Sequence, residues 1–285
     1  MAKIKGVAKR FSGDPVDYVL LFDWLSGKCL GKSVPDTLGN WSFSYYSYVN
    51  CGITYVADGC EPITHGAYEF PYNTALTPIL HYPFDGNTKD YSDRKMDGIL
   101  TGSVTFSEGR KPDTKSARFI NGCVQTPSSL IINSPSVTIS FWIKHVDLTS
   151  ASVVAEIGSS FSASSSFLVS NNDPSSGFIS SAHNTGLGGT HSKKSSGSAG
   201  SEWAHVLVDI NTTRSGTEET KIYINNIDMT TSNGNDKDTS GDLGNGILYI
   251  GQRFASSLPL NGYLQDFRVY NRTLTAEERT LLFTE

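Results

Sequence analysis

The sequence predicts an all-β chain built from two sandwich domains. Three observations favour this class. Short segments of alternating apolar and polar residues recur along the chain, turn residues separate them, and only one segment, near the C-terminus, has a clear helix start signal. Short strands with turns between them are typical of two-layer sandwiches, whereas an α/β protein alternates strands with helices. The 285 residues are enough for two domains.

The first domain is predicted as a small β-sandwich within residues 1–72. Its strands are expected at residues 4–7, 16–22, 40–43 and 53–57. Turn signals separate them at Ser12-Gly-Asp-Pro, Leu25-Ser-Gly and Asp36-Thr-Leu-Gly. Residues 73–78 read as a short linker, and a larger sandwich is expected over residues 79–285.

The larger domain contains the clearest strand pattern of the chain. In residues 138–144, Ile139, Phe141 and Ile143 share one face, and Thr138, Ser140, Trp142 and Lys144 share the other. Further strands are expected at residues 166–169, 177–180, 204–210, 220–224 and 247–251. The Ser- and Gly-rich segment 158–201 contains two of these strands, at residues 166–169 and 177–180. The rest of the segment is expected to form long surface loops on one rim.

One helix is predicted near the C-terminus. Thr275-Ala-Glu-Glu278 fits a capping box, with Thr275 as N-cap and Glu278 reaching back to it, and the helix is expected to run through Leu282.

Charge and hydropathy exclude several classes of partner. The formal net charge is −5 and the charges are interspersed, so nothing marks a surface for nucleic acid or an anionic membrane. The basic start of the chain is followed by no apolar signal-peptide region, and no apolar run is long enough to span a bilayer. We therefore expect a protein made in the cytoplasm, with no signal peptide and no membrane insertion.

Cysteine and histidine spacing does not indicate zinc. Cys29, Cys51, Cys60 and Cys123 show no CxxC spacing, so reduced thiols are expected, with a Cys51–Cys60 disulfide as the alternative. The six histidines have no metal-ligand spacing, and His183 with His191 is the closest pair, in a predicted loop. His205 is expected to pack in a strand or on a sheet surface.

Two distant segments carry a family resemblance. Ile79-Leu-His-Tyr-Pro-Phe-Asp85 and Leu260-Asn-Gly-Tyr-Leu-Gln-Asp-Phe-Arg-Val-Tyr270 resemble the first and last strands of the concanavalin-like, laminin-G-type jelly roll. Between them, Thr138-Ile-Ser-Phe-Trp-Ile143, Glu202-Trp-Ala-His-Val206 and Leu248-Tyr-Ile-Gly251 follow in the family's order. The resemblance implies that the first and last strands pair and enclose one domain.

The same resemblance implies a structural calcium ion. Family members often hold one with an aspartate of the first strand, groups near the following turn and an aspartate of the last strand, which here match Asp85, Asp90 and Asp266. Calcium takes six to eight oxygen ligands, which carboxylates and carbonyls supply. The family's Ser-Gly turn reads Ser92-Asp93 in this chain. The alternative is that Asp85 and Asp90 cap turns and that Asp266 pairs with Arg268 or solvent.

The N-terminal segment resembles a second family. Val19-Leu-Leu-Phe-Asp23, Asp36-Thr-Leu-Gly-Asn-Trp-Ser-Phe43 and Asp58-Gly-Cys-Glu-Pro-Ile-Thr-His-Gly66 resemble the carboxypeptidase-regulatory-like or fibronectin-like domain common in tailed-bacteriophage virion proteins. Together the two resemblances imply a non-enzymatic virion protein displayed on the particle, as head decoration or as a collar or tail accessory. The N-terminal domain would bind other virion proteins of the capsid, collar or tail.

The sequence is also compatible with two other functions. The first is a receptor-binding adhesin that touches host-surface glycans through the jelly-roll rim, residues 158–201 and 231–245. Tyr45-Tyr46-Ser47-Tyr48 and Trp24 could serve an interface, the core or a glycan platform. The remoter one is a polysaccharide-degrading enzyme, although no predicted strand carries a catalytic carboxylate pair and no Gly-x-Ser-x-Gly elbow is present, so no catalytic residue is assigned. A homo-oligomer is compatible with the sequence, without coiled-coil heptads.

Overall fold

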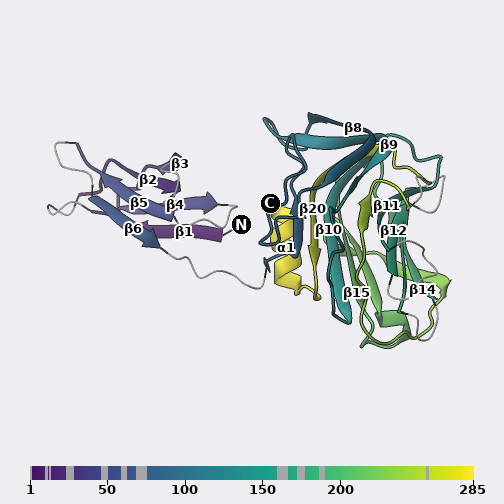
Figure 1. Cartoon of the computed structure of the whole chain (residues 1–285). Coiled ribbons are helices and arrows are strands. Elements are labelled where there is room, and N and C mark those ends of the chain that lie inside the picture. Colours follow the sequence, from purple (N-terminus) through teal and green to yellow (C-terminus); the bar gives the residue numbers. More distant parts are fainter. Residues whose placement is uncertain are drawn as a thin grey trace. The chain divides into compact units, whose positions relative to one another are not determined.

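The computed structural model describes residues 2–9, 12, 14–23, 29–45, 51–58, 63–68, 76–158, 166–171, 177–185, 190–254 and 257–285. The chain divides into two compact units, one within Met1–Leu76 and the other spanning Thr77–Phe283 (Figure 1). Both consist almost entirely of strands, as the sequence predicts. None of the described helices has the length and apolar composition needed to cross a bilayer.

The N-terminal unit contains two antiparallel sheets. One pairs β1 (Ala2–Val7) with β4 (Asn40–Tyr45), and the other has the order β3 (Cys29–Ser33), β2 (Tyr18–Asp23), β5 (Cys51–Val56) and β6 (Ile63–Tyr68). A small apolar core that includes Val19, Leu21 and Trp41 is buried in this unit. The four predicted strands are confirmed. The strands β3 and β6 were not predicted because Gly, Lys, Thr and His interrupt any apolar alternation there.

The second unit is one continuous antiparallel ladder that folds into two layers. Its strands are β7 (Leu80–Tyr82), β8 (Ile99–Glu108), β9 (Lys115–Gln125), β10 (Ser136–His145), β11 (Ser152–Ile157), β12 (Ser166–Asn171), β13 (Phe178–Asn184), β14 (Thr190–Ser198), β15 (Ala204–Asn211), β16 (Thr220–Ile224), β17 (Ile227–Asp228), β18 (Thr230–Asn235), β19 (Leu248–Ile250) and β20 (Gly262–Tyr270). They pair in the order β17-β16-β15-β10-β20-β9-β19-β11-β12-β13-β14-β18, with β7 beside β20 and β8 beside β9. A short 3-10 helix, η2 (Gly216–Glu218), precedes β16. Figure 1 shows β10, β15 and β20 in one layer and β11, β12 and β14 in the other.

The core lies between these layers, and β10 shows how the sequence builds it. Its residues Ile139, Phe141 and Ile143 are fully buried in the apolar core, as their alternation predicts. Phe141 stacks on Phe267 of β20 with 5.9 Å between ring centroids. Trp142 belongs to the opposite, outer face of the same layer.

The helix α1 (Ala276–Thr284) covers part of that outer face. Its capping box is confirmed: the Glu278 backbone N–H donates to Thr275 Oγ1 at 3.3 Å, and the Thr275 N–H donates to the Glu278 carboxylate at 2.9 Å. At the other end of the helix, Phe283 stacks on Trp142, with ring centroids 6.0 Å apart and planes inclined by 17°. The helix therefore hides one stretch of the sheet surface and leaves the next stretch open.

The expectation of loops over residues 158–201 is wrong for β14, which is a full strand of the sheet. It was missed because its buried residues, among them His191, Lys193 and Ser195, are polar and give no apolar alternation. In the second expected rim segment, residues 231–245, the strand β18 occupies the first part.

Replacing Gly251 by Ala should strongly destabilise the jelly roll. Gly251 has φ +93°, and an added Cβ would overlap the ring of the fully buried Phe119. We expect a loss of roughly 2–4 kcal/mol, because both backbone strain and overpacking apply. Gly200→Ala is the control, since Gly200 has φ +69° but nothing within 4 Å of the added carbon. Urea unfolding of both variants measures the difference, and equal losses would contradict the packing argument.

Candidate functional site

The predicted pairing of the first and last strands of the jelly roll is confirmed. Leu80, His81 and Tyr82 of β7 lie opposite Val269, Arg268 and Phe267 of β20. Leu80 and Tyr82 point into the core, whereas His81 is partly exposed. Strands almost two hundred residues apart thus close the domain.

The structure gives each of the three predicted calcium ligands its own protein partners, although Asp90 and Asp266 both contact His81. Asp85 is exposed and accepts from the Lys115 N–H at 2.7 Å. Asp90 is buried, and its carboxylate accepts from the N–H groups of His81, Ser92 and Met96 and from the Ser92 hydroxyl, at 2.7–2.9 Å. Asp90 therefore fixes the loop that follows β7 against that strand.

Asp266 is held by two basic side chains. Its carboxylate lies 2.7 Å from His81 Nε2, and both of its oxygens lie within 3.0 Å of Arg268 nitrogens. Burial alone would raise the pKa of Asp266, but the Arg268 charge and the His81 hydrogen bond outweigh burial and hold the pKa below its usual range. Asp266 has φ +55° and lies where the β10–β20 register shifts, as expected for a β-bulge.

Most oxygens of these aspartates already have partners within the protein. In the described part of the chain, no three His, Cys, Asp or Glu side chains gather as metal ligands would. The oxygens of Asp90 already accept four hydrogen bonds, and the positive charge of Arg268 pairs with the carboxylate of Asp266. The contacts resemble the alternative in which the aspartates cap turns and pair with arginine. The calcium site stays a prediction from the resemblance, and no function is derived from it.

An open row of aromatic and basic residues crosses the outer face of the sheet beside α1. Lys144 of β10 is the cross-strand partner of Tyr263 of β20, and Tyr263 is the partner of Arg118 of β9. Direct partners in antiparallel strands share one face. Trp203 stands just before β15, and its ring centroid lies 6.3 Å from that of Tyr263. These four residues and Asn261 are all partly exposed, and we call them the aromatic–basic face.

Hydrogen bonds hold Arg118 in place on this face. The Arg118 guanidinium lies 5.0 Å from the centroid of the Tyr263 ring. It donates to Asn261 Oδ1 at 2.8 Å and to the Gly262 and Phe119 carbonyls. In the next row, Trp142 is buried beneath Phe283 and the Arg110 guanidinium, which lies 3.7 Å from its ring. The open and covered rows are thus neighbours on the same strands.

Sequence reasoning did not find the aromatic–basic face as a site. Lys144 was predicted correctly on the face opposite Ile139 and Phe141. Arg118, Trp203 and Tyr263, however, are far apart in sequence and form no motif. The signal that could have joined them is strand register, which one sequence does not give.

A second polar cluster is fully buried between the layers. His183 of β13 pairs across the ladder with His191 of β14, and both rings are buried, so neither lies in a loop. The Glu219 carboxylate lies 3.0 Å from His183 Nε2 and also accepts from the Thr239 N–H and hydroxyl. Because solvent and ligands do not reach these buried side chains, we assign the cluster a structural role. His205, on the outer face, is likewise packed as expected, beneath Phe283.

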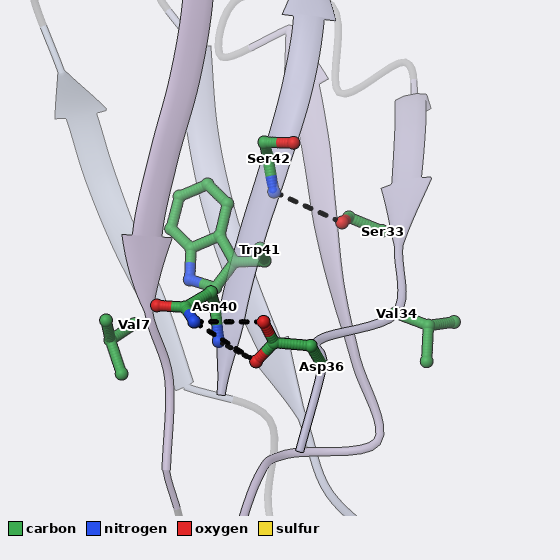
Figure 2. Close-up of a pocket in the computed structure, with 7 residues that line it drawn as sticks. All are labelled: Val7, Ser33, Val34, Asp36, Asn40, Trp41 and Ser42. Carbon is green, nitrogen blue, oxygen red and sulfur yellow. Dashed lines mark hydrogen bonds between the residues drawn. The ribbon is translucent and has the colours of Figure 1, made fainter. Parts of the chain in front are cut away.

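The N-terminal unit has a shallow hollow between β1, β4 and the segment after β3. Figure 2 shows Val7 and Val34 on either side of a pair formed by Asp36 and Asn40, whose side-chain nitrogen lies 2.9 Å from Asp36 Oδ2. Val7, Val34 and Leu38 are 62%, 72% and 65% exposed. We call these three residues the apolar patch. The aromatic segments Trp24 and Tyr45–Tyr48 lie outside the residues whose side chains are described.

Two antiparallel layers closed by their first and last strands define a lectin-like jelly-roll domain. A family model described as concanavalin A-like lectin/glucanases superfamily, Laminin_G_3, matches residues 97–278, and the chain belongs to this family. No curated protein matches the sequence.

Several solved structures resemble the chain at low sequence identity. Domain 4 of AbnA, a GH43 extracellular arabinanase from Geobacillus stearothermophilus in complex with arabinotriose, is 18% identical, with a TM-score of 0.49 over 72% of this chain and 98% of that one. The binding domain of botulinum neurotoxin DC in complex with rat synaptotagmin II is 17% identical, with a TM-score of 0.53 over 73% of this chain and 51% of that one. The same toxin domain in complex with SialylT is 17% identical, with a TM-score of 0.51 over 74% of this chain and 52% of that one. The chain thus spans about half the length of the toxin domains, and the likeness concerns the fold.

The stability of the jelly roll should fall between pH 7 and pH 5 because two histidines are buried in neutral form. Burial lowers the pKa of His145 to about 4 and the pKa of His205 to about 3. In the unfolded chain the histidine pKa is about 6.5, so below this pH the unfolded state binds more protons than the folded state. Stability is therefore lost as pH falls below about 6.5. Each histidine should contribute a loss of about 2 kcal/mol over this range.

Urea unfolding across this pH range measures the effect. The slope of the unfolding free energy against pH reports how many more protons the unfolded chain binds. In His145→Asn and in His205→Asn, this number should decrease by close to one. A stability that stays flat from pH 7 to pH 5 in the unmodified chain would contradict the assignment.

Proposed function

We propose that this protein is a non-enzymatic attachment protein whose jelly roll binds carbohydrate. The observation that carries the proposal is the open Trp203–Tyr263 pair on the sheet face, with the amide of Asn261 and the basic groups of Arg118 and Lys144 beside it. Sugar rings present apolar C–H faces that pack on aromatic rings, and their hydroxyl groups need fixed polar partners. This face offers both on strands that are already ordered.

The composition of the face favours binding over hydrolysis. A glycosidase needs two carboxyl groups on either side of the scissile bond. The charged residues here are Arg118 and Lys144, and neither contacts a carboxylate in the described residues. The family includes both lectins and glucanases, so this difference in side chains, and not the fold, supports the non-enzymatic proposal.

Replacing Trp203 by Ala should weaken glycan binding at least about tenfold, because a central aromatic contact carries much of the energy of a small interface. The full chain is applied to an array of bacterial surface oligosaccharides, and affinity is measured for those that bind. Phe254→Ala is the control, since Phe254 is an exposed aromatic residue of the same domain that does not belong to the face. Equal binding by Trp203→Ala and the unmodified chain would exclude this face as the binding site.

We also propose that the protein is displayed on a tailed-phage particle, as head decoration or as a collar or tail accessory, and is attached through its N-terminal unit. The apolar patch supports this proposal, because three strongly exposed apolar side chains on a small domain, two of them lining one hollow, favour a protein interface. The occupant would be another virion protein, and the jelly roll would then be free to touch host-surface glycans.

The double substitution Val34→Asp and Leu38→Asp should reduce incorporation into particles without unfolding the domain, because both side chains are exposed. Cryo-electron microscopy of particles with and without the protein locates it, and quantification of particle-bound protein measures the effect. Ser12→Asp is the control, because Ser12 is exposed and lines no part of the hollow. Normal incorporation of the double variant would exclude the apolar patch as the attachment surface.

A further inference from the structure

We infer that the aromatic–basic face selects an acidic oligosaccharide, one whose sugar carries a carboxylate that Arg118 and Lys144 bind. This inference rests on the proposed carbohydrate binding and names the chemical class of the ligand. It is carried by the pairing of charges on the jelly-roll surface.

Arg118 differs from most other arginines of the domain. Four of them each pair with a carboxylate, as Arg214–Asp209, Arg253–Glu156, Arg268–Asp266 and Arg272–Glu278. Arg118 is also partly buried, yet its hydrogen-bond acceptors are two backbone carbonyls and the Asn261 side-chain oxygen, all of which are neutral. A partly buried guanidinium held by neutral acceptors keeps its positive charge uncompensated.

The guanidinium retains donors for a ligand. A guanidinium has five N–H groups, and the contacts of Arg118 use three hydrogen bonds. These contacts fix the plane of the group, so the remaining donors are already oriented. A carboxylate is the anion that fits such a planar fork, because it accepts two parallel N–H hydrogen bonds.

Lys144 adds a second cation in the same row. It is the direct cross-strand partner of Tyr263, on the side of that ring opposite Arg118 in the ladder. Neither Lys144 nor Arg118 has an acidic partner within the described part of the chain. Two uncompensated cations in one row are notable in a chain of formal net charge −5, which would otherwise repel an anion.

The length of the row matches a short oligosaccharide. Trp203, Lys144, Tyr263 and Arg118 lie on or beside four adjacent strands, β15, β10, β20 and β9. With neighbouring strands about 4.8 Å apart, the row extends roughly 14 Å. One sugar ring would pack near the Trp203–Tyr263 pair, and the carboxylate of the same or the adjoining ring would reach Arg118.

The experiment compares carboxylated oligosaccharides, each with its methyl ester, for binding to the full chain. An ester keeps the sugar rings and removes the charge. We expect the acid to bind at least about tenfold more tightly than the ester, as for a hydrogen bond to a charged group, and this preference to weaken with added salt. Arg118→Gln and Lys144→Gln should each reduce the preference for the acid. Lys115→Gln, at an exposed position of β9, should leave it unchanged.

The outcomes separate this inference from the proposed function. Equal binding of acid and ester, or an unchanged preference in both Arg118→Gln and Lys144→Gln, would overturn the acidic-ligand assignment while carbohydrate binding stands. Preference for sulfated over carboxylated sugars would overturn the carboxylate assignment alone. Binding of no oligosaccharide, acidic or neutral, would remove the proposed function and this inference with it. Lys144→Gln removes no hydrogen bond that holds the fold, so the test does not depend on Arg118→Gln folding.

Discussion

The antiparallel pairing of β7 with β20 is the constraint on which the rest of the jelly roll depends. It joins the two ends of the domain, and Asp90 reinforces it by accepting the N–H of His81, the central residue of β7. The strand β20 then lies between β10 and β9, so its register determines which side chains share the outer face. The helix α1 begins soon after β20, and its Phe283 covers Trp142 but not Tyr263. Strand closure therefore fixes both the covered and the open part of that surface.

The interior is not uniformly apolar, and the difference between its two parts has a physical cause. Around β10 and β20 the core consists of aliphatic and aromatic side chains, whereas at β13 and β14 the buried residues include His183, His191 and Lys193. Lys193 pairs with Asp236 at 2.6 Å, and Glu219 accepts hydrogen bonds from Thr239 and contacts His183. Buried polar groups are costly unless they are paired, and paired groups restrict the register of the strands that carry them. This end of the sandwich gains specificity of strand register at a cost in stability.

The fold could be predicted from sequence wherever side-chain alternation reflects burial. The strand β10 and its two faces were predicted from the alternation of Ile139, Phe141 and Ile143. The start of α1 was predicted from Thr275 and Glu278. The strand β14 could not be predicted in this way, because its inward residues are polar. The aromatic–basic face was beyond reach for another reason: Arg118, Lys144, Trp203 and Tyr263 come together only through the register of four strands. Sequence reasoning instead emphasised Asp85, Asp90 and Asp266, whose separate contacts became visible only with the structure.

The shape of the aromatic–basic face links the two proposed functions. An open row on a sheet buries little of a sugar, so each site should bind weakly even though Arg118 is already held by hydrogen bonds. Weak sites become effective when many copies engage one surface, because each binding event after the first is intramolecular. Display on a particle, as proposed, would supply those copies. If the face binds sugar and the N-terminal unit provides the attachment, the two together would suit multivalent adhesion, whereas a glycosidase would require a pair of carboxylates at its site.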